Sequence, residues 1–380
     1  MSQLKVNTIR HTGASSDAVT LATDGTCTAK ITNQPPGNRN KIVNGAMTIN
    51  QRNHSGAAGN NAYTLDRWKY QRSANAEFDV VQSTEQAPGF ANCLRLDCTT
   101  GNGTVGAGDY VKLRYHLEGF DVQDFAKGTA SAKKFALSFY VKTSTTGVYS
   151  VSLVDENSRM VTGTYTVSDT NWNRYSIIFP ADTTGTCAND NSAELSIEFN
   201  IIAGSNRTSG TDLRTAWGTY ATASEAVGHT ANPGSSASNN VYITGVQLEV
   251  GDVATDFEHR SYGTELTRCQ RYFQIVGMGT SLCGDSNGAS QVRGLGIPLV
   301  TSMRATPTIG SGVTYHMWHG DNGGKNNDGT AMTVTAIGTT NFPSSAPALM
   351  GVLNGFSGNT DNRMVVAVPN TARMELSSEL

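Results

Sequence analysis

Charged residues are scarce in this chain: they make up 16% of its 380 residues, and the formal net charge is −3. No basic patch stands out, so the sequence gives no electrostatic reason to expect a nucleic-acid partner. No run of about eighteen apolar residues is present, so we expect no membrane insertion. The start of the chain, Met1 to Asn7, lacks the apolar core of a secretory signal, and no export signal is expected there.

Cysteine is also sparse and irregularly placed. The six cysteines form no Cys-x-x-Cys pair; they are Cys27, Cys93, Cys98, Cys187, Cys269 and Cys283. This pattern favours neither a zinc site nor a disulfide framework. We expect buried free thiols, which are typical of a protein made in a reducing cytoplasm.

Recognisable catalytic motifs are missing. The chain has no Gly-x-Ser-x-Gly elbow, no phosphate-binding loop and no His-Glu-x-x-His motif. Glycan cleavage needs two carboxylates in one cleft. The densest acidic groups, Asp155-Glu156 and the trio Asp252, Asp256 and Glu258, fall in expected turns. We therefore predict no enzyme activity, no cofactor and no metal site.

Glycine is abundant, with 40 residues, and threonine, serine and asparagine are frequent. These residue types favour turns and strands over solvated helices. A chain of 380 residues is also too long for one ordinary core. The composition predicts an all-β protein, which we divide at residues 1–38, 39–260 and 261–380.

Residues 1–38 predict a small N-terminal β unit. Short apolar runs alternate with turn signals such as Asp24-Gly25. Three strands of this size bury almost nothing in a monomer, but they become stable if several chains wind around one another. Pro35-Pro36 then breaks the structure and predicts a linker.

Residues 39–260 predict a jelly-roll β-sandwich. Many short strand candidates recur along this stretch, and few helical patterns interrupt them. In 134–142 every second residue is apolar; these residues are Phe135, Leu137, Phe139 and Val141. One face of such a strand is expected to be buried and the other partly wet, as in antiparallel sandwiches.

A helical pattern opens residues 261–380. Tyr262, Leu266, Cys269 and Phe273 are spaced by four, three and four, which forms a heptad-like seam. A helix of about three turns is not stable alone in water. The seam therefore packs either against copies of itself around an axis or onto its own neighbouring sheet. The strand patterns that follow predict a C-terminal β-sandwich domain.

Two sets of motifs resemble known families. The segments 114–119, 135–142, 146–151, 171–180 and 246–249 follow the order of core and turn residues in the jelly rolls of carbohydrate-binding modules. The segment 247–273, with Arg-Cys-Gln-Arg-Tyr at 268–272, is similar to a phrase in virion proteins of tailed bacteriophages. There it links a β-sandwich to a terminal β domain. The resemblance implies a tail fibre or receptor-binding protein.

Aromatic residues beside polar loops are the candidate contact residues. Sugar recognition stacks a pyranose on Trp or Tyr, while amides bond the hydroxyl groups. The distal candidates surround one tryptophan: Trp318, His316, His319, Asn322 and Asn326. Trp217 and Tyr220 lie in a second polar insertion. Trp68 and Trp172 are instead expected to fill the core.

These observations predict an elongated homotrimer that is assembled in the host cytoplasm and exposed on the virion. Its N-terminus would bind other tail or capsid proteins. Several weak sites would together attach the particle to a host-surface glycan without cleaving it. Two alternatives stay open, a capsid-decorating fibre or knob and a glycan-degrading tailspike.

Overall fold

The computed structural model describes residues 6–13, 17–21, 23, 27–29, 38–74, 76–211, 213–276, 282–286, 291–309, 314–319, 332–337, 348–354, 364–369 and 374–380. Within these residues the strands pair antiparallel and the helices are short. The predicted all-β fold class is confirmed. No helix in these stretches is both long enough and apolar enough to cross a membrane.

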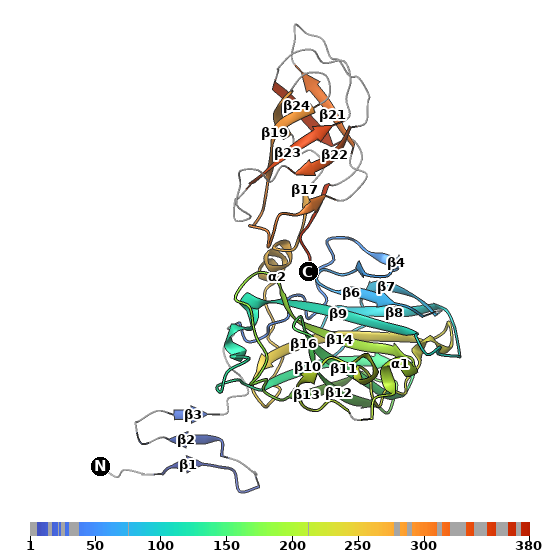
Figure 1. Ribbon diagram of the computed structural model, residues 1–380, viewed down its shortest axis with the longest axis vertical. Coiled ribbons are helices and arrows are strands. Elements are labelled where there is room, and N and C mark those ends of the chain that lie inside the picture. The colour runs from blue at the N-terminus through green and yellow to red at the C-terminus, as the bar shows by residue number, and fades with distance from the viewer. Residues whose placement is uncertain are drawn as a thin grey trace.

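The central body, which we call the sandwich, consists of two stacked sheets (Figure 1). The six-stranded sheet runs in the order β13 (Asn173–Phe179), β10 (Phe135–Thr143), β16 (Asn240–Val250), β8 (Cys93–Thr100), β7 (Glu77–Ser83) and β4 (Ser55–Ala57). The seven-stranded sheet runs in the order β15 (Gly218–Thr219), β12 (Arg159–Val167), β11 (Gly147–Asp155), β14 (Ala193–Ala203), β9 (Tyr110–Glu118), β6 (Lys69–Arg72) and β5 (Ala62–Tyr63).

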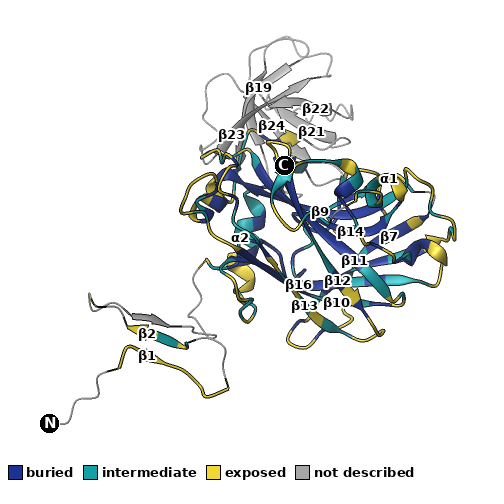
Figure 2. Ribbon diagram, turned by 60° about the horizontal axis from the view of Figure 1, so that its bottom comes forward, coloured by how far each residue is buried: buried dark blue, intermediate teal, exposed yellow. Residues whose placement is uncertain are grey.

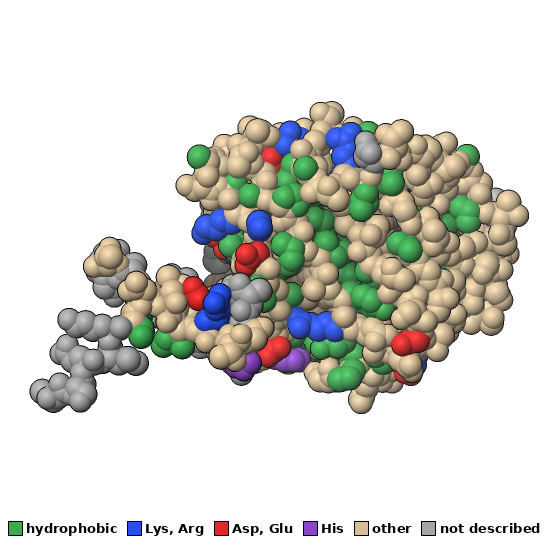
Figure 3. Space-filling model, turned by 90° about the horizontal axis from the view of Figure 1, so that it is seen from below, with side chains coloured by type: hydrophobic (Ala, Val, Ile, Leu, Met, Phe, Trp, Pro, Cys, Tyr) green, Lys and Arg blue, Asp and Glu red, His purple; other side chains and the backbone are tan. Residues whose placement is uncertain are grey.

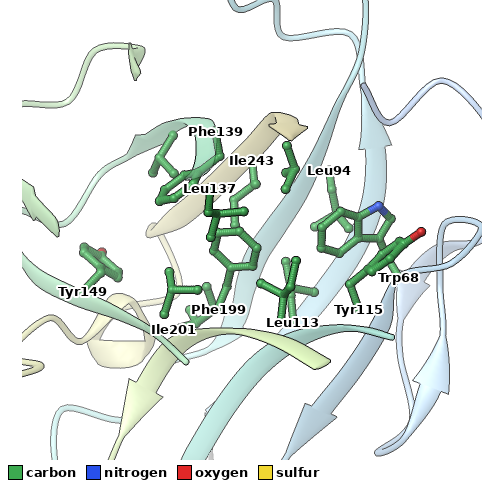
Figure 4. Packing of buried hydrophobic residues seen from close by; sticks show 14 of the residues in the cluster. Trp68, Leu94, Leu113, Tyr115, Leu137, Phe139, Tyr149, Phe199, Ile201 and Ile243 are labelled. Atoms are coloured by element: carbon green, nitrogen blue, oxygen red, sulfur yellow. The ribbon is translucent and has the colours of Figure 1, made fainter. Parts of the chain in front are cut away.

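One hydrophobic core lies between the two sheets (Figure 4). The strands alternate because each sheet presents one face to this core. Trp68 is fully buried, and its ring centroid lies 5.2 Å from that of Tyr115 and 6.2 Å from that of Phe199. Its indole Nε1 donates to the backbone oxygen of Asn44 at 3.2 Å. The core position predicted for Trp68 is confirmed.

Short helices connect the strands: η1 (Gly119–Phe125), α1 (Ser205–Thr208), η2 (Thr222–Ser224), η3 (Pro233–Ser235) and α2 (Tyr262–Gln270). Helix α2 begins at the predicted residue, because the hydroxyl of Ser261 accepts the backbone N–H of Thr264 and caps the first turn.

Helix α2 packs onto its own sandwich. Cys269 and Phe273 are buried in the chain, and Leu266 packs against a cluster that contains Val43. Tyr262 stays 64% exposed. Of the two arrangements that the spacing left open, packing onto the neighbouring sheet is the one found for Cys269 and Phe273. These two residues cannot also line a seam between copies, and the homotrimer stays a prediction.

The N-terminal strands form a separate small sheet in the order β1 (Thr8–Ile9), β2 (Val19–Leu21) and β3 (Cys27–Ala29). Figure 2 shows β1 and most of β2 in the exposed colours. Ile9 is 55% exposed and Leu21 is 40% exposed. Among the described residues, no hydrogen bond joins this sheet to the sandwich. Strands β1 and β2 therefore bury little apolar surface within one chain.

The C-terminal part contains two units. A closed barrel has the order β18 (Leu282–Ser286), β19 (Gln291–Pro298), β23 (Ala348–Asn354), β22 (Met332–Ile337), β21 (Thr314–His319) and β24 (Met364–Pro369). A three-stranded sheet, which we call the neck, has the order β17 (Phe273–Val276), β25 (Met374–Ser377) and β20 (Thr308–Ile309). A sandwich was predicted here. The strands close into a barrel because β24 pairs with both β18 and β21.

The neck and α2 lie between the sandwich and the barrel (Figure 1). Ion pairs fasten the neck to the sandwich. The guanidinium of Arg67 contacts Glu379 at 2.7 Å, and that of Arg52 contacts the same carboxylate at 3.1 Å. Arg271 donates from two nitrogens to both carboxylate oxygens of Glu118, at 2.9 and 2.7 Å. Planar bidentate pairs of this kind fix orientation as well as position.

Candidate functional site

A row of aromatic rings lies on the outer face of the six-stranded sheet. We call it the aromatic strip; it comprises Phe90, Tyr140, Trp172, Tyr242, Phe257 and His259. The alternation of the strands places the rings there. Phe139 and Val141 on either side of Tyr140 are fully buried in the core, so Tyr140 faces the other way.

At one end of the strip, Trp172 contacts Tyr242, with ring centroids 6.1 Å apart. The ammonium of Lys142 lies 5.6 Å from the centroid of the Tyr242 ring. The indole Nε1 of Trp172 has no hydrogen-bond partner among the described residues. Trp172 was expected in the core, and this prediction is wrong. It precedes β13, which is an edge strand, and its half-buried ring packs on the outside of the sheet.

The other end is a tight ring cluster. The centroid of Phe90 lies 5.2 Å from that of Tyr140 and 4.9 Å from that of Phe257. His259 lies 4.9 Å from Phe257 and is exposed. Gly245 makes this packing possible: a Cβ atom there would lie 2.6 Å from the ring of Phe90, and the residue has a φ of +62°.

The two ends belong to one surface. Strand β10 pairs with β16 so that Tyr140 is opposite Thr244 and Lys142 is opposite Tyr242. Tyr140 and Tyr242 are therefore diagonal neighbours, which places such residues about 7–8 Å apart. The rings follow one line across β10 and β16.

Polar groups border the strip. The ammonium of Lys142 contacts Glu85 at 2.6 Å, and Arg95 forms an ion pair with Asp97. Arg174, opposite Tyr140 on β13, donates to backbone and hydroxyl oxygens. A half-exposed row of rings with a polar border suits a ligand that has apolar faces and many hydroxyl groups.

Four of the five charged side chains at the border of the strip form ion pairs with one another. On the side of the molecule drawn in Figure 3, charged side chains are few, and hydrophobic ones lie between uncharged polar groups. Across the described residues, no group of three or more His, Cys, Asp or Glu side chains is arranged to hold a metal ion. The strip therefore offers stacking and hydrogen bonding rather than charge or metal chemistry.

The outer face of the seven-stranded sheet is different. Residues 204–211 and 213–231, which we call the cover segment, lie over its polar side chains. The ammonium of Lys112 contacts Glu198 at 2.7 Å and Glu225 of the cover segment at 2.6 Å. The hydroxyl of Ser152 donates to the backbone oxygen of Glu225 at 2.5 Å. These groups bind one another, so this part of the face is closed.

Burial changes the acid–base properties of two histidines on this face. Desolvation lowers the pKa of His229, which lies in the cover segment, to about 4. Desolvation, with a smaller contribution from the neighbouring cation Arg114, lowers the pKa of His116 to about 2. Both side chains are therefore neutral at physiological pH, and neither is poised for acid–base chemistry there.

Trp217 and Tyr220 were predicted from the sequence as contact residues. They lie on either side of β15, at the edge of the seven-stranded sheet and away from the aromatic strip. The indole of Trp217 donates to the backbone oxygen of Pro180 at 2.8 Å, and its ring packs edge-on against Phe135 at 6.3 Å. Trp217 is thus engaged within its own chain, because β15 pairs with β12 and holds it there. Tyr220 is half-buried beside it in sequence.

The distal candidates lie in the barrel. His316, Trp318 and His319 belong to β21, where Trp318 pairs with Val366. The structure describes the backbone of this strand. Asn322 and Asn326 lie outside the described residues. Contact through this group stays a prediction.

Comparison with known proteins gives a fold likeness. No family model and no curated protein matches the chain. Solved structures similar to it include a carbohydrate-binding module, "CBM4 structure and function", at 10% identity and TM-score 0.28, which covers 55% of this chain and 98% of that one. TmCBM61 in complex with β-1,4-galactotriose matches at 9% identity and TM-score 0.30, over 56% of this chain and 99% of that one.

A family 11 carbohydrate-binding module from Clostridium thermocellum is similar at 14% identity and TM-score 0.27, over 54% of this chain and 98% of that one. At these TM-scores the likeness carries no conclusion about a ligand. The resemblance to phage tail fibres stays a prediction.

Proposed function

We propose that this chain is a non-catalytic attachment protein of a tailed-phage virion, a tail fibre that binds host-surface glycan on its aromatic strip. The observation that carries the proposal is the strip itself. Tyr140, Trp172, Tyr242 and Phe257 are only partly buried, although burying rings of this size is strongly favourable. An apolar row left open on a polar surface marks a contact site.

The strip suits an extended saccharide. Each ring can stack on the apolar face of one sugar unit, and Lys142 and Arg95 at the border can donate to hydroxyl oxygens. Such a shallow surface gives weak affinity for one chain, because little of the ligand is enclosed.

Firm attachment then requires several copies. The N-terminal sheet supports a homotrimer, since Val6, Ile9 and Leu21 are exposed on or beside strands of two or three residues. Sheets this small need further burial to be stable. Three linked strips raise the effective concentration of each for the same polysaccharide. In this proposal the N-terminus also binds other virion proteins.

A glycan-degrading tailspike is the competing proposal from another class. One pair of carboxylates supports it: Asp155 and Glu194 contact the same ammonium of Lys127, at 2.5 and 3.3 Å. All three side chains are buried and bonded to one another, which leaves no room for a sugar between the carboxylates. The pair therefore favours a role in stability. A capsid-decorating fibre differs only in location on the particle.

The proposal is tested by affinity electrophoresis through gels that contain a glucan, a galactan, a xylan or a mannan. We expect the wild-type chain to be retarded by at least one of them. The double variant Trp172→Ala/Tyr242→Ala should lose about tenfold or more in affinity, since stacked rings contribute strongly to such contacts. Tyr110→Ala, which removes a half-buried ring from β9 of the other sheet, is the matched control and should bind as wild type.

Two results would contradict the proposal. Equal retardation of the double variant and the wild type would remove the strip as the site. Release of reducing sugar ends from the retarding polysaccharide would replace the binder with an enzyme. Antibody labelling of particles decides between tail and capsid.

A further inference from the structure

A cavity lies where η1, the first residues of the sandwich and α2 meet. Its lining residues are not those of the aromatic strip. It has a volume of about 350 Å³, at the lower end for ligand pockets and large enough for one sugar unit. We call it the α2 pocket; its lining includes Asn38, Lys41, Phe120, Asp121, Arg268 and Arg271.

An aromatic ring stands open in this pocket. Phe120 lies in η1 and is 53% exposed, whereas Val122 and Phe125 of the same short helix are buried in the core. The helix thus has two apolar anchors inside and places a third apolar side chain in water. Nothing in the described part of the chain covers it.

The pocket also holds one cation without a carboxylate partner. Arg271 is fixed by Glu118, and the ammonium of Lys41 contacts Asp124 at 2.8 Å. Arg268 donates to the amide oxygen of Asn38 and has no ion pair within the described residues. A half-buried guanidinium bonded only to a neutral amide keeps several donors free for an anion.

The lining is chemically two-sided. Asp121 is an exposed carboxylate in the same cavity, on the residue that follows Phe120. A free carboxylate accepts hydrogen bonds from hydroxyl groups, while a free guanidinium binds a carboxylate in a planar fork. An open ring provides the surface on which a sugar stacks.

We infer that the α2 pocket binds a carboxylated sugar unit, a uronic or sialic acid. Its ring stacks on Phe120, its carboxylate is held by Arg268, and its hydroxyl groups donate to Asp121. This site differs from the strip in chemistry, because it selects for charge and encloses a single unit. It stands whether or not the strip binds glycan.

The test is isothermal titration calorimetry of the full-length chain with galacturonic acid and N-acetylneuraminic acid, with galactose as the neutral counterpart. We expect at least one of the two acids to bind, and galactose to bind more than tenfold more weakly. Added salt should lower the affinity for the acid. Arg268→Gln, which keeps much of the side-chain length, loses about tenfold or more because a charge-assisted contact is removed. Phe120→Ala loses affinity with an unchanged melting temperature.

The control variant is Arg174→Gln, which removes a guanidinium beside the strip and leaves acid binding unchanged. Equal affinity for galactose and the acids overturns the inference, as does full acid binding by Arg268→Gln. Absence of heat with every sugar overturns it too. The strip is scored separately, because Trp172→Ala/Tyr242→Ala changes polysaccharide retardation and leaves titration with the acids as in wild type.

Discussion

The two outer faces of the sandwich differ in what lies over them. On the seven-stranded sheet, Lys112, Glu198 and Ser152 face outward, and the cover segment binds them through Glu225. On the six-stranded sheet, residues 255–256 cover Gln247 and Glu249, whereas Tyr140 and Tyr242 face outward and stay half-buried. Similar alternating strands thus produce one face that is closed by its own chain and one that stays partly open.

The charged side chains of the two faces also have different roles. Buried charges are tolerated only when each finds a partner, so the covered face is committed to holding the chain together. On the open face Lys142 is paired with Glu85 and Arg95 with Asp97, and aromatic rings lie between these charged groups. Variants on the covered face should therefore act on stability, and those on the open face on binding.

The largest effect is expected at the covered face. Glu225→Ala removes the carboxylate that Lys112 and Arg207 share; it leaves Arg207 without its ion pair and Lys112 with Glu198 alone. We expect a loss of about 3–5 kcal/mol in the free energy of unfolding, measured by urea denaturation. Glu156→Ala is the control, since Glu156 is 45% exposed in the turn that follows β11. Equal stabilities of the two variants would contradict the idea that the ion pairs of Glu225 hold the cover segment on the sheet.

Low pH should destabilise the fold through a histidine on the same face. His229 is neutral when folded and binds a proton more readily when unfolded, because its pKa falls from 6.5 to about 4 on burial. The unfolded state therefore binds more protons between these values, and stability falls as pH decreases through them. The loss is on the order of 3 kcal/mol between pH 7 and pH 4.

His229→Asn should flatten this pH dependence, as measured by denaturation at several pH values. His116, whose pKa is lowered to about 2, keeps part of the slope. A variant with the slope of the wild type would show that His229 is not the group that titrates.

An intermediate effect is expected under the strip. Gly245→Ala places a Cβ atom against Phe90 and Tyr140 at a left-handed φ, and we expect a loss of about 1–3 kcal/mol together with loss of polysaccharide binding. Gly251→Ala separates the causes. Gly251 also has a positive φ, but no atom lies within 4 Å of the position that a methyl group would take there. If both variants behave alike, backbone strain alone explains the result.

The smallest change in stability is expected at the open end of the strip. Trp172→Ala should cost less than about 1 kcal/mol, because surface substitutions usually change stability little. Trp68→Ala, in the core, should cost about 3–5 kcal/mol. Thermal unfolding of the two variants makes the comparison. A large loss of stability for Trp172→Ala would show that this residue has a structural role.

The alternation of residues predicted the elements well. Strand β10 and the start of α2 lie where the pattern placed them, because burial of one strand face and capping by Ser261 are local properties. The same pattern could not tell which outward face would be covered. That depends on the cover segment, which is far away in the sequence. The strip was missed for this reason, although Tyr140 stood at an outward position in a strictly alternating strand.

Contacts between residues far apart in the sequence also determine what the predicted seam packs against. The spacing of Leu266, Cys269 and Phe273 identified an apolar helix face correctly, but a spacing does not state its partner. The partner is the cluster around Val43 in the same chain. The surroundings of Trp217 were hidden in the same way, since its bond to Pro180 joins distant parts of the sequence.

The neck has a consequence for how such a protein can diversify. Val276 at the end of β17 is paired with Met374 at the start of β25, so the chain departs and returns at adjacent positions. All six barrel strands lie in sequence between these two residues. The same stretch also contains β20 and Arg304, which bind the neck. Exchange of the six barrel strands for another tip would therefore have to keep residues 300–309 as well as the two ends. The ion pairs of Glu379 and Arg271 would stay in place beneath any new tip.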